Sequence, residues 1–89
     1  MPYIKQDRRE VLDPLIEPLL EQLETRGERN YAITKILHHF IQTNGGLRYD
    51  QVNDAIGIAF CSALELYNAV AVPYESVKKD ENGPVSDLD

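Results

Sequence analysis

The chain has 89 residues, a formal net charge of −6 and 43% hydrophobic residues, which are proportions typical of one soluble globular domain. The acidic balance argues against a general nucleic-acid-binding protein, because phosphate contacts need a clustered cationic face that this sequence lacks. Cys61 is the single cysteine, which excludes an internal disulfide and a thiolate zinc site within one chain. We expect no membrane span and no signal peptide, and therefore a cytoplasmic protein.

The first predicted helix covers about residues 13–26. Asp13 can cap its start, Pro14 suits its first position, and Gly27 can end it. Leucine and isoleucine recur inside it at spacings of three and four, which places them on one apolar stripe. Pro18 removes one backbone hydrogen bond, so we expect a bend near it.

Two further helices are predicted, over about residues 31–43 and 50–72. Asn30 can cap the second helix, which stops at the "NGG" sequence, and Pro73 should end the third. Apolar residues cover more than half of the circumference of the third helix. Because two short helices cannot cover that arc, we expect a homo-oligomer, a dimer or larger, held through the 50–72 helix.

The predicted fold is therefore an all-α, three-helix domain with a long C-terminal helix, a short extended N-terminus and a polar C-terminal tail. We assign residues 1–75 to the helical domain and residues 76–89 to a polar tail or a short return segment. In the second case Val85, after a turn, could pair with the extended Tyr3 and Ile4. Such a two-strand contact would be marginal alone.

The stretch "NYAITKILHHFI" carries the most distinctive polar pattern in the chain. Tyr31, Thr34 and His38 fall on one edge of a helix beside its apolar stripe, whereas His39 diverges from His38 by about 100°. The two histidines therefore cannot share a metal within one chain. Hydroxyl, amide and imidazole groups at the border of apolar surface are typical of a small-ligand pocket, and equally of an ordinary helix interface.

Several polar residues extend this candidate site beyond the second helix. Asn53 and Tyr67 lie on the third helix, where it should meet the second. Arg8 and Arg9 near the N-terminus suit a phosphate or carboxylate group. The candidate ligand-binding residues are therefore Tyr31, Thr34, His38, Asn53, Tyr67, Arg8 and Arg9.

No catalytic or metal-binding signature is present in the sequence. There is no H-E-x-x-H spacing and no phosphate-binding glycine loop, since "NGGL" lacks the following lysine and helical hydroxyl. The lone cysteine and the serines have no context that directs a base at them. We therefore expect a non-enzymatic protein without a cofactor or a metal.

Six motifs spread over nearly the whole chain carry a family resemblance: "MPYIKQDRR", "LDPLIE", "NYAIT", "YDQVNDAIG", "LELYNAVAVPYE" and "ENG". In this order they resemble an uncharacterised family of short microbial and phage proteins, described as a domain of unknown function. The resemblance implies no activity and no mechanism.

Two function classes follow from these observations. In the first, a helical homo-oligomer binds and sequesters a small polar or nucleotide-like ligand at a subunit interface, which a ligand-dependent rise in melting temperature would reveal. In the second, a phage-type accessory protein docks on a partner protein and regulates it. Capture of a defined partner by a variant lacking the Tyr31 and His38 side chains would favour the second class.

Overall fold

A computed structural model describes residues 4–88, and all of their regular secondary structure is helical. The chain forms α1 (Gln6–Gln22) and α2 (Arg26–Thr43), followed by one continuous helix. That helix consists of α3 (Tyr49–Leu66), the π-helical turn η1 (Tyr67–Ala71) and α4 (Val72–Asn82). The all-α fold with a long last helix, which the apolar periodicity predicts, is confirmed.

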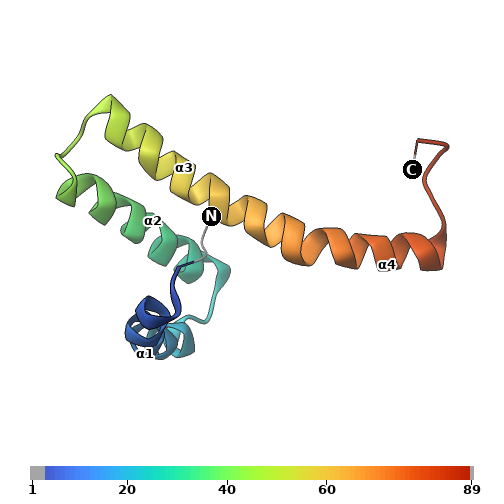
Figure 1. The fold of residues 1–89 in the computed structure, drawn as a ribbon, viewed down its shortest axis with the longest axis horizontal. Coiled ribbons are helices and arrows are strands. Elements are labelled where there is room, and N and C mark those ends of the chain that lie inside the picture. The colour runs from blue at the N-terminus through green and yellow to red at the C-terminus, as the bar shows by residue number, and fades with distance from the viewer. Residues whose placement is uncertain (1–3, 89) are drawn as a thin grey trace.

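The helices α2 and α3 form an antiparallel hairpin, and the other elements extend away from it (Figure 1). Gly45 and Gly46, with φ angles of 106° and 83°, form the tight connection between them, in a region of backbone conformation that favours glycine. In the part of the chain that the structure describes, the backbone of α1 packs closely against no other helix, and α4 contacts only η1. The hairpin is therefore the only packed unit of these helices.

The first helix begins well before the predicted residue 13. Its N-cap is Lys5, which makes no side-chain capping hydrogen bond, and both Pro14 and Pro18 lie inside the helix. Asp13 is consequently an interior residue, and the prediction that it caps the helix is wrong. Pro18 leaves the Pro14 carbonyl without its helical partner, but this helix is exposed along most of its length, so water can bind that oxygen.

The start of α2 also differs from the prediction. Thr25 Oγ1 accepts a hydrogen bond from the Glu28 N–H at 3.0 Å, and Glu28 Oε1 accepts one from the Thr25 N–H at 3.2 Å. This reciprocal pair is a capping box, so the helix begins directly after Thr25. Asn30 is therefore an interior residue, and Gly27 lies in the first turn of α2 instead of ending α1.

The prediction that Pro73 ends the third helix is wrong, and the π-helical turn η1 supplies the reason. Pro73 lacks an N–H group, and in an α-helix its ring would clash with the carbonyl of Ala69. In η1 the Val72 N–H instead bonds the Tyr67 carbonyl, five residues back, and this wider turn gives the proline room. The helix then continues to Asn82.

The end of α4 shortens the predicted polar tail. Gly83 ends the helix with a φ angle of 84°, and its N–H bonds the Lys79 carbonyl at 2.7 Å. Residues 76–82 of the predicted tail are thus helical. No strand exists among residues 4–88, so Val85 does not form the predicted strand pair with Ile4; Tyr3 lies outside the described residues.

Very little of this chain is covered by the rest of it. Ala55 on α3 is the only buried residue among those that the structure describes, at 4% exposure. The radius of gyration is 17.3 Å, whereas a compact domain of this length has about 12 Å. Residues 4–88 of one copy therefore form no closed hydrophobic core.

Candidate functional site

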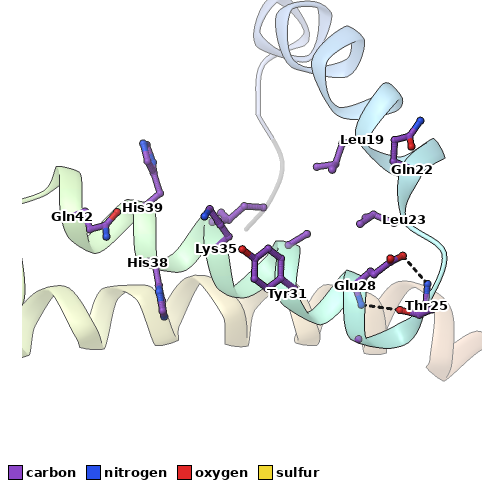
Figure 2. Close-up of a pocket in the computed structure, with 13 residues that line it drawn as sticks. Leu19, Gln22, Leu23, Thr25, Glu28, Tyr31, Lys35, His38, His39 and Gln42 are labelled. Carbon is purple, nitrogen blue, oxygen red and sulfur yellow. Dashed lines mark hydrogen bonds between the residues drawn. The ribbon is translucent and has the colours of Figure 1, made fainter.

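The main candidate site is an open groove of about 950 Å³ between the end of α1 and the outer face of α2 (Figure 2). Leu19 and Leu23, at the end of α1, line one side of the groove, and Ala32 and Ile36 of α2 line its apolar base. The polar residues of the groove are Gln22, Thr25, Glu28, Tyr31, Lys35, His38, His39 and Gln42. The groove thus combines an apolar base with amide, phenol, ammonium and imidazole groups.

The capping box holds one end of this groove in place. Glu28 Oε1 accepts hydrogen bonds from the N–H groups of Glu24, at 2.7 Å, and Thr25, at 3.2 Å. These two bonds lower the pKa of the Glu28 carboxyl below its usual value of 4.5. Arg29 donates from its guanidinium to the carbonyls of Thr25 and Leu23, at 3.1 and 3.0 Å. The turn between α1 and α2 is therefore fixed by side chains of α2.

Aromatic and basic side chains line the middle of the groove. The Lys35 ammonium lies 5.8 Å from the centroid of the Tyr31 ring, within the range of a cation–π contact. His38 and His39 extend from α2 in opposite directions (Figure 2). No group of three or more His, Cys, Asp or Glu side chains among the described residues is arranged to hold a metal ion.

The structure separates the residues that the sequence places in one pocket. Tyr31 and His38 line the groove between α1 and α2, but Thr34 does not, and its hydroxyl lies 3.4 Å from Asn30 Oδ1. Asn53 lines a second cavity, of about 590 Å³, between α2 and α3. Tyr67 is half-exposed in η1.

The two N-terminal arginines line neither cavity. Both lie in the first turn of α1, and Arg9 donates from Nε to the Ile4 carbonyl at 3.1 Å. Of the seven predicted residues, the structure therefore brings Tyr31 and His38 together in one groove.

Sequence reasoning missed the contribution of α1 to this groove. Leu19 and Leu23 belong to the apolar stripe of the first helix, which reads as ordinary core in the sequence. The signal that could have located the groove is the "TRGE" sequence of the capping box, because it places a turn directly after Leu23 and so sets where the two helices diverge. Lys35 and Gln42 could then have been assigned to the facing side of α2.

The long helix has one further property of functional interest. By length and composition alone, Tyr49–Asn82 is apolar enough to cross a membrane, and nearly all of its apolar stretch is exposed. Core helices of soluble proteins can have the same length and composition, so this property shows only that a large apolar surface is available.

Comparison with known proteins identifies a family. A family model described as "Domain of unknown function (DUF6899)" matches residues 1–85. No curated protein and no solved structure matches the chain.

Proposed function

We propose that this chain, which belongs to the DUF6899 family of unknown function, is a non-enzymatic helical homo-oligomer that acts by binding. The observation that supports this proposal is the apolar surface that the folded chain leaves uncovered. Large apolar side chains are exposed on every helix, among them Leu15 on α1, Ile36 on α2, Phe60 on α3 and Val77 on α4. Soluble monomers rarely expose apolar surface on this scale.

The size of the uncovered surface agrees with a stable subunit interface. The chain exposes 7802 Å², whereas a compact monomer of its mass, 10.1 kDa, exposes about 5,300 Å². The excess of about 2,500 Å² per chain is roughly three times the ~800 Å² that each partner buries in a standard interface. A second copy is the simplest partner, because most soluble oligomers are homo-oligomers.

The groove between α1 and α2 is the proposed ligand site. Its Lys35 and histidine side chains suit an anionic group, and the Tyr31 ring beside apolar Leu23 and Ile36 suits a flat apolar one. A small polar or nucleotide-like molecule carries both features. Because this groove is open, such a ligand can enter it from solvent.

A membrane location is the less favourable explanation of the same apolar surface. Glu65 lies at the midpoint of the long helix Tyr49–Asn82, so a single span would place its carboxyl near the centre of the bilayer. A charged side chain is costly there, with about 2.5–3.5 kcal/mol for Arg, Lys or Asp on insertion scales. We therefore propose a cytoplasmic oligomer.

Docking on a partner protein, as a phage-type accessory protein does, is the second candidate function. The observation that favours it is the projection of α4 beyond the hairpin (Figure 1), with Tyr74 and Val77 more than half-exposed. An amphipathic helix of this kind can lie in the apolar groove of another protein.

Native mass spectrometry followed by thermal melting tests the binding proposal. We expect an oligomer, and a rise in melting temperature with at least one member of a panel of nucleoside mono-, di- and triphosphates. In the double variant Tyr31→Phe and His38→Ala this rise should be lost. Tyr74→Phe on α4 is the matched control, since it removes the same hydroxyl outside the groove. An unchanged rise in the double variant would place the ligand elsewhere.

A further inference from the structure

A regular stripe of residues runs along the uncovered side of α3. Its members are separated alternately by four and three residues from Tyr49 to the first residue of η1, and they are Tyr49, Asn53, Ile56, Phe60, Ala63 and Tyr67. Alternation of four and three is the spacing by which one helix packs its side chains between those of a second helix. We call this set the α3 seam.

Every member of the α3 seam is exposed. Ile56 and Phe60 at its centre are 60% and 62% exposed, and Tyr49 and Tyr67 at its ends are 84% and 50% exposed. The helix α2 covers a different side of α3, where Ala55 is buried. Asn53 also borders the cavity between α2 and α3. Apart from that edge, the seam is a second packing face that no helix of the described chain covers.

Gly57, on the flank of the seam near its midpoint, provides an independent observation. It follows Ile56 in the interior of α3, on the flank of the seam that borders the cavity between α2 and α3. Apart from its chain neighbours and the backbone of its own helix, a Cβ atom added there would meet no atom within 4 Å. Its φ angle is not positive, so neither backbone conformation nor packing inside the chain requires glycine. Glycine weakens a helix interior relative to alanine, and its usual use at such a position is to let another backbone approach closely.

We propose that two copies of this chain pair in antiparallel orientation along the α3 seam, with Gly57 near the two-fold axis. This inference rests on the self-association proposed above and specifies its geometry. Full overlap of the two seams sets Tyr49 opposite the partner's Tyr67, and Ile56 opposite the partner's Phe60. Two α2–α3 hairpins then form a four-helix bundle.

The sizes of the seam residues favour the antiparallel arrangement. In this register Phe60 always faces the partner's Ile56, and Ala63 faces the partner's Asn53, so each of the four inner layers joins a larger and a smaller side chain. A parallel pair would instead place two Phe60 rings in one layer and two Ala63 methyl groups in the next. Layers of uneven volume leave a cavity in one place and crowding in another.

The end of the seam at η1 fixes the extent of the overlap. The π-helical turn has more residues per turn than an α-helix, so the side chains of α4 continue on a different face. The regular seam accordingly stops at Tyr67, the first residue of η1. Full overlap of the two seams is the register that leaves none of their apolar members uncovered, while α4 of each copy projects past the bundle.

Disulfide cross-linking of single-cysteine variants tests the orientation. In a Cys61→Ala background, Tyr49→Cys and Tyr67→Cys are prepared as separate full-length chains with tags of different mass, and oxidised alone or mixed under copper–phenanthroline. Antiparallel pairing separates Tyr49 from the partner's Tyr49 by about 27 Å along the helix. We expect the mixture to cross-link at least ten times faster than either variant alone. Asn82→Cys mixed with Tyr49→Cys is the control outside the seam.

The other outcomes overturn the proposal in distinguishable ways. Rapid cross-linking of each variant alone would show a parallel pair. A species that sediments as a dimer but forms no seam disulfide would show that the copies associate through another surface, which leaves the proposed self-association intact. A monomer in sedimentation at the same concentration would contradict both the pairing and the proposed homo-oligomer.

Discussion

Replacement of Gly57 by alanine should have opposite effects on the stability of a monomer and of a dimer paired along the α3 seam. In an isolated chain, alanine at this open helical position would stabilise the fold by about 1 kcal/mol. In the paired state the added methyl group meets the backbone of the second helix, and such overpacking costs about 1–3 kcal/mol.

We therefore expect Gly57→Ala to weaken dimerisation by about tenfold, in line with a cost of ~1.4 kcal/mol. Gly27→Ala is the matched control, because Gly27 also lies in a helix and its nearest neighbouring atom, Thr25 Oγ1, would be 3.8 Å from the new Cβ. Sedimentation equilibrium measures both variants. Unchanged or tighter association of Gly57→Ala, with a higher melting temperature, would show that no helix crosses at this position.

The capping box at the start of α2 gives a second prediction for single residues. Thr25→Ala removes the oxygen that accepts from the Glu28 N–H, and the loss of such a cap costs about 1 kcal/mol. Chemical denaturation should show this decrease in the free energy of unfolding, whereas Thr34→Ala within the same helix should lower that free energy by less. Equal losses in the two variants would mean that the cap does not stabilise α2.

The pH dependence of the same cap follows from the Glu28 carboxyl. Hydrogen bonds from the N–H groups of Glu24 and Thr25 lower its pKa in the folded chain. Its stabilising effect is consequently complete above the usual value of 4.5, and is lost as the pH falls through the lower folded value. The protection of the Thr25 amide, measured as its hydrogen exchange relative to the intrinsic rate at each pH, should fall over that acidic range in the wild type. Glu28→Gln should remove the pH dependence, and its persistence would assign it to another group.

At the scale of helices, periodicity in the sequence predicts the number and type of the elements but not their ends. The leucine stripe of α1 is a local feature of the sequence, and it correctly indicates a helix. The capping pattern of α2 is a local feature as well. The end of the third helix could not be predicted, because Pro73 usually stops an α-helix and only the π-helical geometry of η1 allows the chain to continue. Asp13 and Asn30 are good capping residues by type, yet earlier positions begin both helices.

The candidate site was less predictable than the fold, for a physical reason. Helical spacing shows that Tyr31 and His38 share a side of α2, and both line one groove. Spacing within one helix does not show which other helix faces that side. The sequence pattern predicts that α3, through Asn53, faces that side, whereas the groove lies against α1.

The short segment after α4 carries a prediction for truncation. A chain that stops after Asn82 loses an exposed segment, in which Val85 and Leu88 are 94% and 96% exposed. Circular dichroism of this chain should therefore retain the helical signal, and its melting temperature should change by only a few degrees. Loss of the cooperative transition would show that the segment is needed for the fold.

At the scale of the whole molecule, the open shape of one copy is the feature that any account of function must explain. Among residues 4–88, the helices α2 and α3 pack only against each other. The helix α1 diverges from this hairpin, and α4 projects beyond it (Figure 1). A second copy on the α3 seam would complete the hydrophobic core of the hairpin. The same assembly would leave the groove between α1 and α2 available to a ligand.

Sedimentation velocity of the wild type at tens of micromolar tests most directly whether a second copy covers the apolar surface. We predict a particle of about twice the chain mass of 10.1 kDa, and a shift toward the monomer in Phe60→Glu, because that change places a carboxylate in the seam. Leu47→Glu is the control, since Leu47 is 86% exposed in the α2–α3 connection and lies outside the seam. A wild-type chain that sediments as a helical monomer would contradict the account.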